Sequence, residues 1–132
     1  MFKLIKIENG RMNVPSPVYL EVTDSVAISA GDALKITSGK LVKVTATDNP
    51  TYIALGNKSA TDTARTLACI RVEPNQVYET TFSAKPESLA VGSKVTLDSG
   101  KQVTATATNG VATIVSIEGA SKSGDKVLVR FE

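Results

Sequence analysis

The sequence predicts an all-β protein built from two tandem small antiparallel β-barrel or β-roll units that share one compact body. Val and Thr dominate, and Gly and Pro recur at intervals of roughly ten residues, as in proteins made of short strands. No window shows the apolar periodicity of about 3.6 residues that marks an amphipathic helix. Nearly the same phrase also occurs twice, as "ITSGKLVKVTAT" from Ile36 and as "LDSGKQVTATAT" from Leu97, which predicts a duplicated unit.

The first 13 residues lie outside this repeat and are expected to form an N-terminal arm or hairpin. "FKLIKI" at 2–7 alternates like a strand, and the following "ENGR" contains the Asn-Gly pair of a tight type I′ turn. Residues 2–7 and 11–14 are therefore a candidate hairpin. The alternative is an arm that pairs with a strand elsewhere in the chain.

The repeat extends well beyond the shared phrase. Before it, "PSPVY" at 15–19 matches "PNQVY" at 74–78, and after it "CIRVE" at 69–73 matches "LVRFE" at 128–132. The two units are thus residues 14–73 and 74–132, each of roughly 60 residues. A unit of this size is marginally stable alone, so we expect the two copies to share a core, or each copy to pack against its twin or against a partner.

About five short strands are expected in each unit, the number that small barrels use to limit exposed edges. In the first unit the expected strands are 18–23, 32–37, 40–47, 52–57 and 67–73. In the second unit they are 77–82, 93–98, 101–108, 112–118 and 126–132.

A Ser-Gly pair stands between the second and third strands of each unit and predicts a tight turn. Strand alternation then predicts one apolar face for each of these hairpins. The predicted faces are Leu34, Ile36, Val42 and Val44 in the first unit, and Val95, Leu97, Val103 and Ala105 in the second. Tyr19 and Tyr78 occupy equivalent places, and we favour core positions for both over interface anchors.

The composition contains little that points to catalysis. The chain has no histidine, which excludes Ser-His-Asp and Cys-His arrangements and histidine metal sites. Ser-Lys pairs occur at 38/40 and 99/101, but they fall on predicted turns, where a lysine stays protonated. We therefore expect no enzyme activity, and we predict no catalytic, cofactor-binding or metal-binding residue.

Charge and aromatic content also argue against several partners. The net charge is +2 with acidic and basic residues interspersed, so no patch for nucleic acid or membrane stands out. There is no Trp, which counts against a sugar-binding cleft and against stacking platforms for single-stranded nucleic acid. Cys69 has apolar neighbours and is expected to be a small buried residue. No signal peptide or membrane span is apparent, so synthesis in a host cytoplasm is expected.

A family resemblance adds a function to this outline. The stretch "SAGDALKITSGKLVKVTATDNPTYIALGNKSA" at 29–60 resembles small β-rich capsid decoration proteins of bacteriophages, also called head-stabilising or auxiliary capsid proteins. The resemblance implies a small β-barrel or β-roll that attaches to the exterior of an expanded capsid, at local symmetry axes and often as a trimer. The partner would be the major capsid protein. Because two fused units can supply pseudo-symmetry within one chain, a monomer or dimer is an alternative to the trimer.

In such proteins an N-terminal segment contacts the shell, so the resemblance implies a capsid interface in the arm. The apolar contacts expected are Phe2, Leu4 and Ile7, and the cationic ones, directed to an acidic shell surface, are Lys3, Lys6 and Arg11. The alternatives are another virion β module, such as a head-fibre base or a tail-tube-like protein, and a carbohydrate-binding β module. No cofactor is expected in any of these cases.

Overall fold

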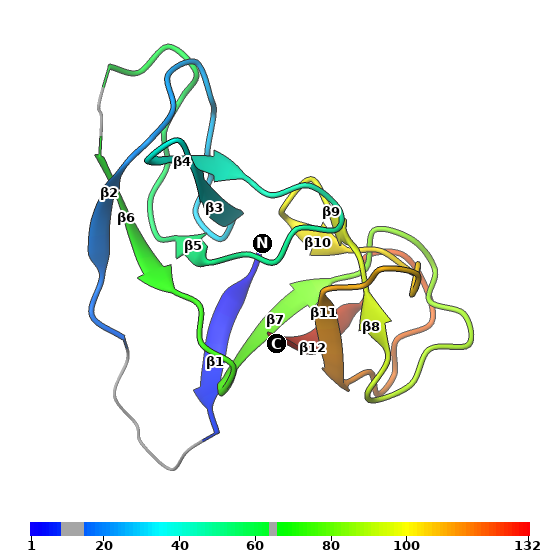
Figure 1. Cartoon of the computed structure of the whole chain (residues 1–132). Coiled ribbons are helices and arrows are strands. Elements are labelled where there is room, and N and C mark those ends of the chain that lie inside the picture. Colours follow the sequence, from blue (N-terminus) through cyan, green and yellow to red (C-terminus); the bar gives the residue numbers. More distant parts are fainter. Residues whose placement is uncertain (9–14, 64–65) are drawn as a thin grey trace.

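The computed structural model describes residues 1–8, 15–63 and 66–132, and among these residues the chain forms strands and no helix (Figure 1). The strands pair in antiparallel ladders, joined by a few isolated bridges. The predicted all-β class is confirmed. Each of the ten strand segments expected in the two units contains an observed strand, and the second strand of the second unit is divided in two at Thr96.

The first sheet takes its strands from the first half of the chain. They are β2 (Val18–Glu21), β3 (Ala33–Thr37), β4 (Lys40–Lys43), β5 (Tyr52–Ala54) and β6 (Thr66–Arg71). Their order in the sheet is β2-β6-β5-β3-β4.

The second sheet contains strands of the second half together with the N-terminal strand. Its members are β1 (Lys3–Ile7), β7 (Gln76–Thr81), β8 (Lys94–Val95), β11 (Ala112–Ser116) and β12 (Lys126–Phe131), in the order β1-β7-β12-β11-β8. A separate two-stranded ladder joins β9 (Leu97–Asp98) to β10 (Gln102–Val103). Figure 1 shows β1 in the middle of the molecule, between the two groups of strands.

Apart from β1, the two halves arrange their strands alike. In each half the first strand pairs with the last, the last with the fourth, and the fourth with the second. In each half a parallel bridge also links the end of the first strand to the third, Val22 with Leu41 and Phe82 with Val103. A duplicated unit would produce this common order. The duplication and the boundaries 1–13, 14–73 and 74–132 stay predictions.

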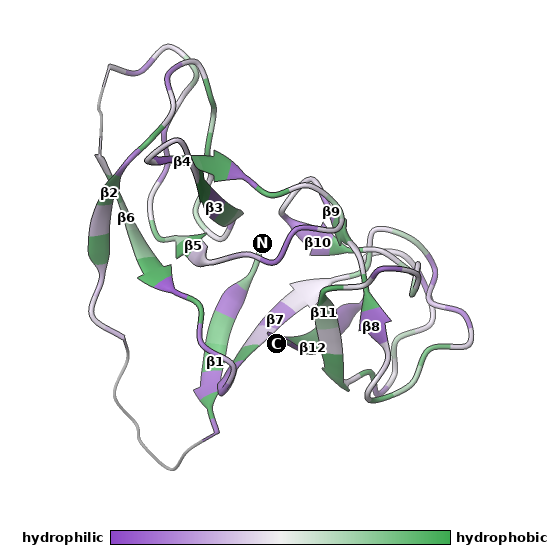
Figure 2. Cartoon of the chain, viewed as in Figure 1, coloured by the Kyte–Doolittle hydropathy of each residue, from purple (hydrophilic) through white to green (hydrophobic). Residues whose placement is uncertain are grey.

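The larger of two hydrophobic clusters joins the two sheets. It contains Ile53 and Ile70 of the first sheet and Tyr78, Ile114 and Phe131 of the second, so the halves share one core. A smaller cluster lies within the first half, around β3, β4 and β6. Figure 2 shows the hydrophobic residues concentrated on the strands, with the loops mostly hydrophilic.

The turn between β9 and β10 also connects the halves, through backbone contacts. The Ala33 N–H donates to Gly100 O at 2.7 Å, and the Leu97 N–H donates to Ala46 O at 2.9 Å. Gly100 has φ of +65°, and a Cβ at this position would lie 3.0 Å from Ala33 O. Gly39, in the matching turn of the first half, has φ of +79°, and a Cβ there would meet no atom within 4 Å.

In the second of these hairpins Val95, Leu97 and Val103 are buried as predicted and Ala105 is half-buried, whereas the single apolar face predicted for the first hairpin is wrong, although Leu34 and Val44 are buried. Leu97 pairs with Val103 and both are buried, as expected. In the first half, Thr37 pairs with Lys40, so Ile36 lies opposite Leu41. Cross-strand partners share a face, which places Val42 and Val44 on the other side. Leu41 therefore takes the buried place predicted for Val42, and Ile36 is 41% exposed.

The core position predicted for both Tyr19 and Tyr78 is likewise right in the second half and wrong in the first. Tyr78 is buried, as predicted, and its hydroxyl donates to Gln76 Oε1 at 2.6 Å. Tyr19 is 70% exposed, so the core position predicted for it is wrong. The two parallel bridges place Val22 and Phe82 at equivalent positions in the two halves. Counting back from them, the residue equivalent to Tyr19 is Glu79, one residue after Tyr78. A shift of one residue turns a strand side chain to the opposite face of its sheet.

Candidate binding groove beside the first strand

The N-terminal strand β1 extends the second sheet by pairing with β7. Leu4 lies opposite Tyr78, and an irregularity between Leu4 and Lys6 leaves Ile5 without a direct partner. Such a bulge re-aims the side chain of the extra residue, and Ile5 is 44% exposed. Of the two possibilities for the arm, pairing elsewhere in the chain is therefore observed, while the strand expected at 11–14 lies outside the described residues.

The residues expected at a capsid interface are spread between core and surface. Phe2 is 2% exposed and packs edge-on against Phe131, with ring centroids 5.4 Å apart, so it is a core residue. Leu4 is half-buried against the same core, and Ile7 is half-buried. Lys3 and Lys6 are exposed. Arg11 lies outside the described residues.

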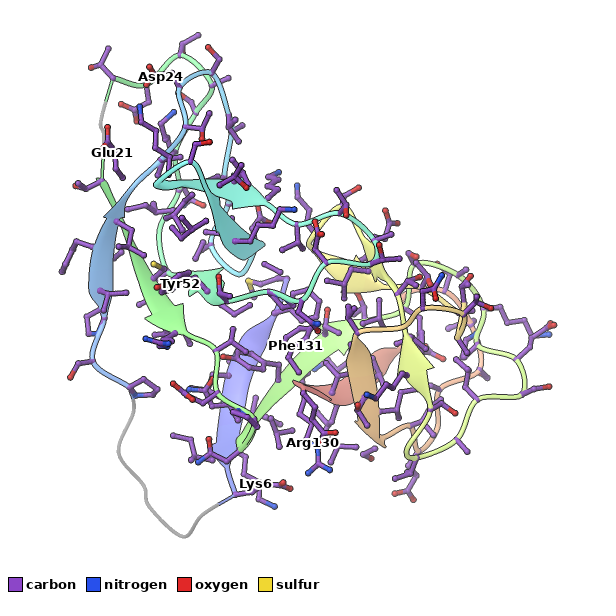
Figure 3. All side chains as sticks on the ribbon, in the orientation of Figure 1. Lys6, Glu21, Asp24, Tyr52, Arg130 and Phe131 are labelled. Atoms are coloured by element: carbon purple, nitrogen blue, oxygen red, sulfur yellow. The ribbon has the colours of Figure 1, made fainter. Side chains whose placement is uncertain are left out.

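These β1 residues border an open groove with a volume of about 810 Å³. Ile53 and Ile70 of the first sheet, with Leu55 just after β5, line its floor, and Pro15 and Pro17 line it as well. Binding pockets for small ligands usually span about 300–1,000 Å³, so the groove is large enough for a bound segment. Figure 3 shows Lys6 at the outer end of β1, near the margin of the molecule.

The floor is apolar because the first sheet has hydrophobic side chains on both faces. Alternate residues of β6, Leu67 and Cys69, point into the smaller core, whereas Ile70 pairs with Ile53 and belongs to the larger one. Beyond Ile53 this second face continues to Leu55, whose N–H donates to Ala68 O at 2.9 Å. Leu55 is 48% exposed. β1 therefore covers only part of this apolar face of the first sheet and leaves Leu55 partly exposed.

The backbone edges around the groove differ in what they can bind. The outer edge of β1 pairs with no described strand, although the Phe2 N–H at its beginning donates to Gly31 O at 2.8 Å. Pro15 and Pro17, in the segment that leads into β2, have no N–H to donate. Prolines at such positions discourage pairing with another strand. Of these two sides, the β1 side is the one able to accept an added strand.

The charged side chains that line the groove are both lysines, Lys3 and Lys6. Lys6 Nζ lies 3.8 Å from Glu8 Oε1, and the Lys6 side chain is largely exposed, so this ion pair is weak. The groove therefore combines an apolar floor with a cationic side. Sequence reasoning identified Lys3, Leu4, Lys6 and Ile7 but missed Ile5 and Leu55, for which the sequence carries no signal beyond hydrophobicity.

Polar groups elsewhere in the described residues serve structural roles. Asp32 is buried, lies 3.3 Å from Lys43 Nζ and accepts a hydrogen bond from the Ser29 N–H at 2.9 Å. Lys58 is also buried and donates to Val26 O and Ser59 O, at 3.3 and 3.2 Å. Both side chains hold loops of the first half together.

Cys69 is fully buried, as predicted, and burial raises the pKa of its thiol to about 11. Over residues 1–8, 15–63 and 66–132, no group of three or more His, Cys, Asp or Glu side chains could hold a metal ion. The same residues contain no helix able to cross a membrane.

No family model matches the chain, and a comparison with curated proteins finds no match.

Proposed function

We propose that this protein is a structural component of a phage virion that binds the exterior of the assembled capsid and stabilises it. The observation that supports this most is the apolar groove beside the open edge of β1. An exposed apolar surface next to a strand edge without a described partner is typical of a site where another protein docks. The resemblance of residues 29–60 to capsid decoration proteins supports the choice of the major capsid protein as partner.

The proposed mechanism is thermodynamic linkage. A protein that binds the assembled shell but not its separated subunits shifts the equilibrium towards the shell. Free protein at 100 times its Kd contributes about 2.7 kcal/mol for each occupied site. Many sites on one shell would add up to a large resistance to disassembly, with no catalytic residue involved.

Co-sedimentation tests this function. Purified protein is mixed with undecorated, expanded shells of the virus that encodes it, and with unexpanded shells as the control. We expect saturable binding to expanded shells at a fixed ratio to the capsid subunit, and an increase in the temperature at which those shells disassemble. Folded protein that does not bind them would contradict the proposal and favour a fibre, tail-tube or sugar-binding role.

A further inference from the structure

We infer that the groove binds an extended segment of the partner protein, which pairs as an added strand with the open edge of β1 and carries acidic side chains at its ends. This inference deepens the proposed function and rests on it only for the identity of the protein that supplies the segment. Its three parts, the strand pairing, the apolar contact and the acidic ends, follow from different features of the groove.

The strand pairing follows from the backbone of β1. Between Leu4 and Ile7 no strand of the described residues pairs with its outer edge, and we infer that the N–H and C=O groups there bind another main chain. An extended peptide added to such an edge gains affinity from main-chain hydrogen bonds. Pro15 and Pro17, which also line the groove, offer no N–H groups. The bound segment would therefore pair with β1 alone.

The apolar contact follows from the floor of the groove. β1 is 5 residues long, and an added strand of equal length would be about 17 Å long. Alternate side chains of such a strand point to one face, where they would meet the exposed Leu55 beside the buried Ile53 and Ile70. The segment should thus carry apolar residues at every second position, and Leu55, which is half-exposed, should become buried.

The acidic ends follow from the charge of the groove. Lys3 and Lys6 are its only charged lining side chains among the described residues. Acidic groups on the bound segment would complement them and favour encounter, whereas a basic segment would be repelled. The same charges argue against a second copy of this chain, because pairing β1 with β1 would bring the lysines of both copies into one groove.

The probe is a fluorescently labelled, capped nonapeptide in which Val and Thr alternate between two terminal Asp residues. A second peptide carries Lys in place of Asp, and a third carries N-methyl groups on alternate amides, which removes donors for strand pairing. Fluorescence polarisation should show saturable binding of the Asp peptide, with binding at least tenfold weaker for the other two. In NMR spectra of the protein, the peptide should shift the amide signals of residues 4–7 and Leu55.

Two matched variants connect this binding to the groove. Leu55→Glu places a carboxylate on the floor, and Val91→Glu places one at an exposed apolar position that does not line the groove. Since both positions are exposed, both variants should fold. We expect Leu55→Glu to weaken peptide binding at least tenfold and Val91→Glu to leave it unchanged.

Several outcomes would overturn the inference. They are the absence of saturable binding of the Asp peptide, equal binding by Leu55→Glu, and a stable dimer of the protein that Leu55→Glu dissociates. Shell binding separates the inference from the proposed function. If the peptide binds but shells do not, the groove assignment stands and the capsid role fails. If shells bind the original protein and Leu55→Glu equally, the capsid role stands and the groove assignment fails.

Discussion

Replacing Gly100 by alanine should destabilise the protein more than the same replacement at Gly39, because the turn that contains Gly100 contacts the other half of the chain and the turn that contains Gly39 does not. Both glycines follow a serine in equivalent turns, and both have positive φ. A Cβ on Gly39 would meet no atom within 4 Å. A Cβ on Gly100 would lie 3.0 Å from Ala33 O, beside the hydrogen bond from the Ala33 N–H to Gly100 O.

The magnitudes follow from these two geometries. Holding alanine at positive φ costs about 1–2 kcal/mol, and this is the whole effect expected at Gly39. At Gly100 the new methyl group also pushes against the backbone of Ala33, which weakens a hydrogen bond worth about 1 kcal/mol. We therefore expect a loss of about 1–2 kcal/mol for Gly39→Ala and about 2–3 kcal/mol for Gly100→Ala.

Urea unfolding, followed by circular dichroism, measures the difference. With an m value of roughly 1–3 kcal/mol/M, the midpoint for Gly100→Ala should fall below that of Gly39→Ala by about 0.3–1 M. The two variants share the chemical change and the unfolded-state effect, so their difference isolates the contact between the halves. Equal midpoints, or a lower one for Gly39→Ala, would refute the reasoning that this turn couples the two halves of the chain.

Three further predictions concern single side chains. A hydrogen bond from the Lys35 ammonium lowers the pKa of Asp48 to about 2. The ionised Asp48 carboxylate therefore stabilises the fold above about pH 4, and this contribution is lost as the pH falls towards 2. Asp48→Asn should show a smaller loss of stability over that interval in urea titrations. The buried Cys69 thiol should react with an aromatic disulfide reagent far more slowly in folded than in urea-unfolded protein, and equal rates would contradict its burial. Tyr78→Phe removes the hydrogen bond to Gln76 and should cost about 1 kcal/mol; an unchanged Tm would contradict this.

The strands of this protein could be predicted from sequence because alternation and turn residues act locally. The face of the sheet to which each side chain points could not be predicted in the same way, because it depends on the number of residues in each turn. The same Ser-Gly-Lys sequence closes a pairing of Thr37 with Lys40 in one half and of Asp98 with Gln102 in the other. This difference of one residue decides whether the third strand buries the predicted side chains.

The candidate site was only partly predictable for a related reason. The alternation in residues 2–7 predicted a strand, but its partner is β7, which begins at Gln76, far away in the chain. Phe2 is a core residue because that pairing brings it against Phe131. Leu55 belongs to the groove because the covering of the first sheet by β1 ends before it. Both outcomes are set by tertiary contacts between distant segments, which no local pattern encodes.

Co-sedimentation with expanded, undecorated shells is the most direct test of the central proposal. The capsid-binding role predicts saturable binding at a fixed ratio to the capsid subunit. The groove assignment adds that Leu55→Glu should bind at least tenfold more weakly and that Val91→Glu should bind like the original protein. Folded protein that remains in the supernatant at every concentration would contradict it.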